Sequence, residues 1–418
     1  MRGWLHLTVT WPPVLPPGAS SDAGVLLQTR ALRALGDGIV SVVLAAYLNA
    51  IGLSELRIGM VVTVTLLGSA GLTLAVGLRA HAYPRRRLLR LVSLLMIATG
   101  VGFATFTTFW AIALVGLIGT LNPSGGDVSV FLPTEQALLP GTIADEHRTA
   151  LFARYSLIGT LGAAIGASLA GIPDWLAGRL DITTTTALRG TFVAYALIGL
   201  VVFTRYRHLT TEVEHSGPPT RHALGPSKRT VYRLAALFSL DAFGGGFVIT
   251  ALIVLWLQRR FALSLAVSGA VFFWAGLLSA FSALVAVRIA RRIGLVRTMV
   301  FTHLPANGLL ILTAFMPNAG LAVACLLARA ALSQMDVPAR TSYVMAVVTP
   351  DERPAAASIT NVPRSLASAL PPLAAGWMLT HSTFGWPLIC GGSIKVAYDL
   401  LLLNQFRDLR PPEEQLIA

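Results

Sequence analysis

Residues 231–257 read VYRLAALFSLDAFGGGFVITALIVLWL, an apolar run that holds a single carboxylate, Asp241. A membrane-spanning helix needs roughly 20 mostly apolar residues. A carboxylate inside such a helix is costly and is usually retained for the path of a substrate or a proton. Asp37, Asp127 and Asp336 lie in other apolar runs of similar length. The pattern therefore predicts a membrane protein with an internal pathway for a solute or a proton.

The composition indicates the same class of protein. Of 418 residues, 55% are hydrophobic and 12% are charged, and the mean hydropathy of +0.70 is too high for a soluble domain of this size. We predict an all-α integral membrane fold with about twelve transmembrane helices in two pseudo-symmetric six-helix halves. The predicted spans are 31-52, 57-79, 87-108, 110-132, 148-172, 187-204, 231-257, 264-287, 296-316, 319-338, 354-380 and 384-404.

A polar stretch at the midpoint separates the two halves. The predicted organisation is a cytoplasmic N-terminal tail (1-30), an N-terminal half (31-204), a cytoplasmic linker (205-230), a C-terminal half (231-404) and a cytoplasmic C-terminal tail (405-418). Six spans on each side of a linker are typical of a duplicated transporter. No stretch outside the spans is long enough for a separate catalytic domain, so we expect no enzymatic activity.

The net charge of +13 is concentrated in alternate loops. Arginines follow the second span at Arg85 and Arg86, surround the central linker, and follow the eighth span at Arg291 and Arg292. By the positive-inside rule, this distribution places both termini in the cytoplasm. We therefore expect a multi-pass protein of the plasma membrane, in contact with the lipid bilayer and without a nucleic-acid partner.

Residues typical of metal or cofactor sites are scarce. The two cysteines, Cys325 and Cys390, lie in apolar spans and are expected to pack there. The eight histidines are dispersed, and the chain has no phosphate-binding Gly-x-x-x-x-Gly-Lys sequence. We expect neither a metal nor a cofactor.

The loop after the second span resembles a motif of the major facilitator superfamily, Gly-x-x-x-Asp-Arg-x-Gly-Arg-Arg. Gly77, Arg85 and Arg86 match its opening glycine and closing arginines, whereas His81 and Pro84 replace its aspartate and second glycine. The resemblance extends over nearly all of the chain. It implies alternating access, in which the two halves rock around a site near the membrane midplane.

Five carboxylates are candidates for transport or proton coupling: Asp37, Asp127, Glu135, Asp241 and Asp336. Asp127 follows Asn122, a proline, a serine and two glycines, which interrupt the fourth span and free backbone groups to line a cavity. Two alternatives remain open. Instead of a role in transport, Glu135 could cap the next helix. Independently, Asp37 could form an ion pair with Arg33 one turn earlier.

Further polar residues are candidates for the cavity or its gates: Asn122, Arg329, Gln334, Arg340, Asn361 and Arg364. Arg329 and Asp336 are seven residues apart and so lie on nearly the same helix face. This position suits either a gating ion pair or contacts with the substrate. Lys395 and Asp399 are four residues apart, which favours an ion pair within one helix.

Glycines of the fifth and seventh spans are expected to serve close helix packing. Gly159, Gly162 and Gly166 have the spacing of small-residue contacts between membrane helices. Residues 244–246 are three consecutive glycines, which destabilise a helix by about 1 kcal/mol each relative to alanine. A hinge or a close approach of another helix would account for them.

The predicted function is secondary active transport of a small solute by alternating access, coupled to protons and directed outward. One alternative is a uniporter or metal-ion exporter, in which the same acids bind a cation. An alternative of another class is a membrane sensor that does not transport. We expect a small-molecule or ion substrate and a monomer.

Overall fold

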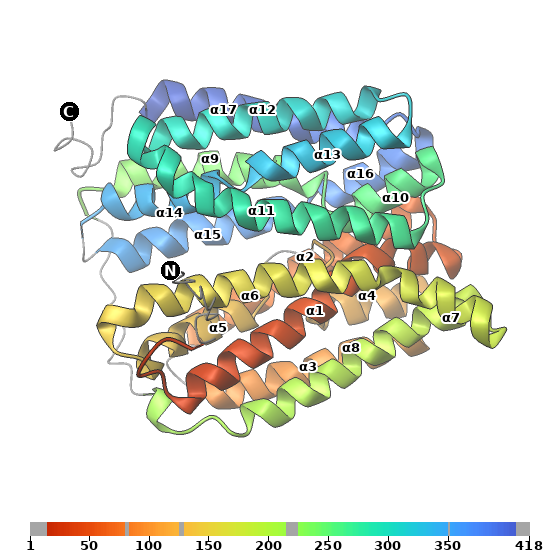
Figure 1. The fold of residues 1–418 in the computed structure, drawn as a ribbon, viewed down its shortest axis with the longest axis horizontal. Coiled ribbons are helices and arrows are strands. Elements are labelled where there is room, and N and C mark those ends of the chain that lie inside the picture. Colours follow the sequence, from red (N-terminus) through yellow and green to blue (C-terminus); the bar gives the residue numbers. More distant parts are fainter. Residues whose placement is uncertain (1–14, 80–82, 125–128, 215–224, 350–351, 407–418) are drawn as a thin grey trace, which may run out of the picture.

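The computed structural model describes residues 15–79, 83–124, 129–214, 225–349 and 352–406. These residues form helices and connecting segments, and the helices run nearly side by side in two bundles (Figure 1). One bundle contains α1 to α8 and the other contains α9 to α17. The predicted all-α architecture of two halves is confirmed.

The N-terminal half consists of α1 (Ser21–Ala50), α2 (Glu55–Arg79), α3 (Arg85–Thr105), α4 (Phe109–Ile118), α5 (Phe131–Leu138), α6 (Arg148–Ser168), α7 (Ile172–Leu180) and α8 (Thr184–Tyr206). Short 3-10 turns lie at Leu139–Thr142, Asp145–His147, Leu169–Gly171 and, in the linker, Glu212–Glu214.

The C-terminal half consists of α9 (Lys228–Gly246), α10 (Thr250–Phe261), α11 (Leu265–Ile293), α12 (Leu295–Phe315), α13 (Ala319–Ser333), α14 (Asp336–Ala346), α15 (Arg353–Ala369), α16 (Pro371–His381) and α17 (Trp386–Phe406).

Each predicted span overlaps one helix or a broken pair of helices, although several bounds differ. Within the described ranges, ten helical segments are long and apolar enough to cross a membrane. The fourth span is interrupted after Ile118, as its asparagine, proline and glycines indicate, and the eleventh is interrupted at Leu370, before two prolines. The first helix begins at Ser21, whereas the first predicted span begins at residue 31.

Polar side chains cap several helices at the ends where backbone amides lack a partner. The Thr183 hydroxyl accepts from the amide of Thr186, and the Ser264 hydroxyl accepts from the amide of Val267. The Asn318 carbonyl oxygen accepts from the amide of Leu321 at 2.9 Å. These caps start α8, α11 and α13.

Glycines bring α1 and α6 into direct backbone contact. A Cβ atom on Gly162 would lie 3.0 Å from Cβ of Ala34, and a Cβ on Gly166 would overlap the carbonyl of Leu35. Gly38 meets the backbone of α6 in the same way. The predicted role in close helix packing is confirmed for Gly162 and Gly166 of the fifth span, whereas a Cβ on Gly159 would meet the side chain of Arg30.

The glycines at the end of α9 also serve a close approach. A Cβ atom on Gly244 would lie 2.9 Å from the carbonyl oxygen of Gly391 in α17, and one on Gly246 would overlap the carbonyl of Ser368 in α15. The α9 helix ends at Gly246, and α10 begins at Thr250. The three glycines therefore mark both a close packing point and a break in the seventh span.

The two halves meet at the end of the molecule where α2 begins. Arg259 of α10 forms an ion pair with Glu55 of α2. In the next turn Gly59 packs against Gly376 of α16, with so little space that a Cβ on Gly376 would lie 2.9 Å from Cα of Gly59. The hydroxyl of Thr250 donates to the carbonyl oxygen of Ser124 at 2.9 Å.

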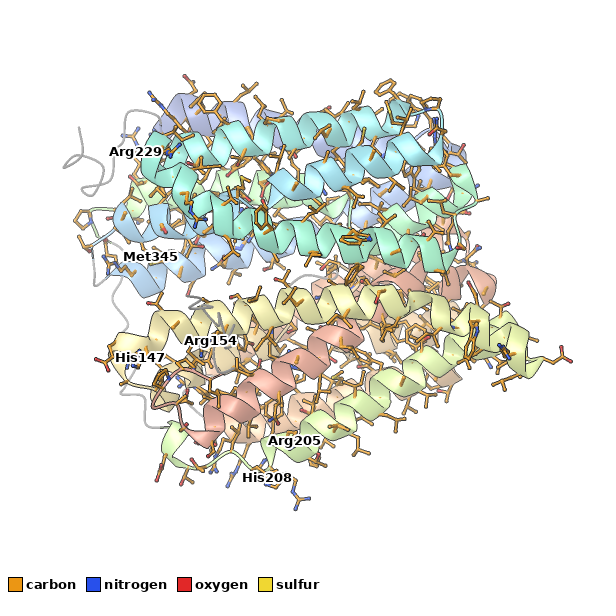
Figure 2. The ribbon with its side chains drawn as sticks, in the orientation of Figure 1. His147, Arg154, Arg205, His208, Arg229 and Met345 are labelled. Atoms are coloured by element: carbon orange, nitrogen blue, oxygen red, sulfur yellow. The ribbon has the colours of Figure 1, made fainter. Side chains whose placement is uncertain are left out.

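Basic residues of both halves lie at the opposite end. Figure 2 places His147 and Arg229 there, one from each half, far from α7 and α10. The described contacts between the halves thus hold the molecule together at the end away from these basic residues.

Polar contacts fix both ends of the linker to the helical bundles. Arg86 donates from its Nε atom to Glu214 at 3.0 Å, and the hydroxyl of Thr210 donates to Asp22 at 2.6 Å. After the linker, Gly225 donates its amide to Glu352, which precedes α15. Hydrogen bonds, chiefly from Ser227, lower the pKa of the Glu352 carboxyl from 4.5 to about 2.

Candidate functional site

A buried carboxylate, Glu135 of α5, lies at the centre of a polar cluster in the N-terminal half. It is fully buried and forms an ion pair with Arg33 of α1. Tyr155 of α6 and Tyr206 of α8 donate their hydroxyls to it, the second at 2.5 Å, and the hydroxyl of Thr29 donates at 2.9 Å. Four helices therefore meet at one carboxylate.

This cluster decides one of the two alternatives left open for the first half, the role of Glu135. Glu135 does not cap the following helix, because its oxygens are engaged inside the bundle by Arg33 and two tyrosines. Arg33 forms an ion pair with Glu135, and its guanidinium lies 4.3 Å from the ring centre of Phe131. The ion pair and the aromatic ring compensate the charge of this buried guanidinium, although its Nε atom makes no hydrogen bond to a described residue. The alternative of an ion pair between Asp37 and Arg33 stays a prediction.

Asp37 lies farther along α1 and remains partly exposed. The Tyr195 hydroxyl of α8 is 3.5 Å from its Oδ1 atom, a long contact, and 3.3 Å from the carbonyl oxygen of Thr120. Because the Asp37 side chain is partly exposed, water can reach this carboxylate.

The break in the fourth span faces the other half. Asn122 is buried, and its side-chain oxygen accepts from the hydroxyl of Ser124 at 2.7 Å. The amide of Ala251 in α10 donates to the carbonyl of Pro123 at 3.3 Å. The freed backbone groups thus bond across the two halves. The candidate Asp127 lies outside the described residues.

A second buried cluster surrounds Asp241 of α9 in the C-terminal half. The ammonium group of Lys395 in α17 lies 2.5 Å from its Oδ1 atom, and Nη1 of Arg340 in α14 lies 3.3 Å from Oδ2. The Nε2 atom of His303 in α12 lies 3.8 Å from Oδ1. Three cationic or titratable side chains from three helices therefore converge on one carboxylate.

Two further carboxylates extend this cluster. Asp336 pairs with Arg340 one turn along α14 at 3.1 Å. Asp399 of α17 is bound by Nδ1 of His303 and by the side-chain amide of Asn307, both at 2.9 Å. The predicted pair between Lys395 and Asp399 is wrong, because the two side chains bond to different helices.

Arg329 and Arg364 lie beside the cluster without joining its ion pairs. The Nε atom of each is buried and makes no hydrogen bond to a residue in the described part of the chain. Both are within electrostatic reach of Asp241. Asn361, one turn before Arg364, is exposed, as is Gln334 in the break between α13 and α14.

Several central residues of the two clusters were not predicted from the sequence: Tyr155, Tyr206, His303 and Asn307. Tyrosines in apolar spans are common, and dispersed histidines carry no ligand spacing. The available signal was the i, i+4 spacing of His303 and Asn307 within one apolar span, which places both on one helix face. Among the described residues, no three His, Cys, Asp or Glu side chains lie close enough to hold a metal ion.

An all-helical protein with two bundles, membrane-length apolar helices and polar clusters inside both bundles has the architecture of a membrane transporter. The family model of the Major Facilitator Superfamily matches residues 27–370. The chain belongs to this superfamily.

Known proteins resemble the chain over nearly its full length. An uncharacterized membrane protein of Saccharomyces cerevisiae, YJR124C, is 25% identical and covers 93% of this chain and 94% of its own. The bacterial homolog of the human lysosomal transporter Spinster, solved in an inward-facing and occupied conformation, superposes with a TM-score of 0.70 at 15% identity, over 95% of this chain and 99% of its own. A D-xylose-proton symporter superposes with a TM-score of 0.71 at 15% identity, over 91% and 96%. At these identities the solved structures share the fold.

Proposed function

We propose that the chain is a proton-coupled secondary transporter, which moves a small solute by alternating access. The proposal is supported by three side chains in sequence, Asp399, His303 and Asp241, which we call the row. One ring nitrogen of His303 is 2.9 Å from Asp399, and the other is 3.8 Å from Asp241. Imidazole is suited to passing protons between such groups, since it accepts on one nitrogen and donates from the other.

Protonation of Asp241 would couple the row to helix movement. A protonated carboxyl has no net charge, so its attraction to Lys395 of α17 and Arg340 of α14 would fall sharply. Unpaired cations inside a bundle are costly. Rearrangement of α14 and α17, or binding of a substrate, would relieve that cost. The buried cluster therefore contains a proton acceptor, and protonation of that acceptor destabilises the present arrangement of α14 and α17.

Asp37 supplies the matching carboxylate in the N-terminal half. It is partly exposed in the first span, which has the same place in its half as the span of Asp241 in the other. We assign it the exchange of protons with water in the cavity. The Glu135 cluster, sealed by four polar partners, is better suited to holding α1, α5, α6 and α8 together.

We propose outward transport across the plasma membrane, with both termini cytoplasmic. Positive charge near Arg86 and Arg229 supports a cytoplasmic position for that end. Contacts such as the Glu55–Arg259 ion pair hold the halves together at the other end. An exporter must load its substrate while that outer end is closed.

Proton coupling is tested in sealed vesicles that contain the full-length protein and a pH-sensitive dye. Solutes from a chemically diverse panel are added with and without an imposed pH gradient. We expect one class of solute to move protons and to accumulate only with the gradient. Turnover by the protein also separates a transporter from a sensor.

Two variants locate the coupling. Asp37→Asn and His303→Gln are expected to abolish gradient-driven accumulation while exchange of substrate down its own gradient continues. Glu146→Gln is the control, because Glu146 is largely exposed and its described ion pair is with the neighbouring His147. Unchanged pH dependence in both variants would exclude this proton pathway, and gradient-independent flux in the unaltered protein would favour the uniporter.

A further inference from the structure

The α15 helix carries a polar stripe across the membrane core. Its polar residues recur at the helical spacing of one face: Ser358, Asn361, Ser365 and Ser368, with Arg364 beside them. The helix contacts α9 of its own half and α2 of the other half, so it lies between the bundles. Asn361 is exposed there. A polar side chain exposed at this depth faces a water-filled path rather than lipid.

Arg364 and Arg329 lie near the middle of the membrane. Arg364 is eleven residues from the start of α15 at Arg353, and Arg329 is ten residues from the start of α13 at Ala319. At about 1.5 Å per residue, each is roughly 15 Å into a hydrocarbon core about 30 Å thick. Both side chains are partly exposed, although each has a buried Nε atom without a described partner.

The charges around these arginines do not balance. Among the described groups near Asp241, four lysine or arginine side chains meet three carboxylates: Arg329, Arg340, Arg364 and Lys395 against Asp241, Asp336 and Asp399. Lys395 and Arg340 are already bound by Asp241 and Asp336, and Asp399 is bound by His303 and Asn307. The remaining two cations are Arg364, on the same helix as the polar stripe, and Arg329, which like Arg364 is within electrostatic reach of Asp241.

We infer that Arg329 and Arg364 bind an anionic group, a carboxylate or a phosphate, of the transported solute. This inference rests on the proposed function, because it names the substrate class for the same cavity. A guanidinium presents a planar set of donors that matches the two oxygens of a carboxylate or phosphate. A bound anion would balance the excess charge and give Nε of each arginine an acceptor. Asn361, one turn from Arg364, would add a neutral donor to fix orientation.

Binding to the purified full-length protein in lipid nanodiscs tests this inference. The probes are inorganic phosphate, succinate and benzoate as anions, with choline as a cation and xylitol as a neutral solute, all at constant ionic strength. Affinity is measured from the shift in thermal unfolding and from tryptophan fluorescence. At least one anion is expected to bind, and Arg329→Gln or Arg364→Gln is expected to weaken that binding about tenfold or more, the effect of one charged hydrogen bond.

Arg205→Gln is the matched control, because Arg205 is an exposed arginine at the end of α8. If the glutamine variants do not fold, Arg329→Lys and Arg364→Lys decide, since they keep the charge and remove the planar fork. The inference is overturned if no anion binds, if only choline or xylitol binds, or if anion affinity is unchanged in both arginine variants. Comparing the affinity for phosphate with the affinities for succinate and benzoate shows whether the site prefers a phosphate or a carboxylate.

The binding experiment uses no ion gradient. An anion that binds through both arginines but shows no gradient-driven flux would overturn the proposed coupling and retain this inference. Gradient-driven flux of a cationic or neutral solute that is insensitive to both arginine substitutions would support the proposed coupling and overturn this inference.

Discussion

Glu135 and Arg33 depend on each other because both are buried and charged. Glu135→Gln keeps the shape of the side chain but leaves Arg33 as a buried, uncompensated cation. Removing one partner of a buried pair costs about 3 kcal/mol or more. We therefore expect a clear fall in the free energy of unfolding, measured by chemical denaturation in detergent.

Arg33→Met combined with Glu135→Leu should recover much of that loss, because replacing a buried pair by apolar groups is often neutral. Glu146→Gln, on an exposed side chain, should change the free energy of unfolding by less than about 0.5 kcal/mol. Equal stability of Glu135→Gln and the unaltered protein would mean that the pair contributes nothing to folding.

At the residue scale, the sequence predicts which side chains belong to polar sites better than it predicts the residues to which they bond. An acid in an apolar span has few explanations, so Asp241, Glu135 and Arg340 were predicted as members of polar sites. Their partners come from other helices, and helix rotation sets those distances. The four-residue spacing of Lys395 and Asp399 is compatible with a pair within α17, but the ion pair forms with Asp241 of α9 instead. Only packing of the two helices decides between them.

At the element scale, α1 and α6 require glycine where their backbones touch. Gly166→Val would place its side chain against the backbone at Leu35 and force the helices apart. Overpacking of this kind costs about 1–3 kcal/mol. We expect a lower midpoint of thermal unfolding for Gly166→Val. Gly190→Val in α8 is the control, because no atom lies within 4 Å of its added Cβ. An equal fall in both variants would show that the contact with Leu35 is not the cause.

The helix pattern was predictable because each span needs its own apolar run, and breaks follow visible residues. Pro123 lies in the break of the fourth span, and Pro371 follows the break in the eleventh. The start of α1 was less predictable. Arg30 and Arg33 resemble the polar flank of a span, but the bundle buries both and extends the helix back to Ser21.

For the whole molecule, the positions of the arginines predict its orientation in the membrane. In a background with Cys325 and Cys390 replaced by alanine, a cysteine at exposed Arg87 or Lys228 should resist an impermeant reagent added outside intact cells. A cysteine at exposed Asp181, between α7 and α8, should react. Labelling of the first two positions from outside would reverse the orientation and, with it, the proposed direction of transport.

The contact between Gly59 and Gly376 predicts how to change the state of the whole molecule. Gly376→Leu would push α16 from α2, where a Cβ meets the carbonyl oxygen of Glu55 at 2.6 Å. A cost of about 2 kcal/mol for this state shifts its equilibrium with the alternative by roughly thirtyfold. We expect the halves to separate at this end and to approach at the arginine-rich end.

Spin labels measure both ends of the molecule in Gly376→Leu. One pair at Ser54 and Thr383 spans the end where α2 meets α16, and another at Arg87 and Lys228 spans the opposite end. The first distance should increase and the second should decrease, because rigid halves that rock must move oppositely at their two ends. Gly308→Leu, at an exposed glycine of α12 with no atom within 4 Å of an added Cβ, should leave both distances unchanged. If both distances stay constant in a folded Gly376→Leu protein, this contact does not control the state, and the rocking proposed for the transport cycle must turn on other contacts between the halves.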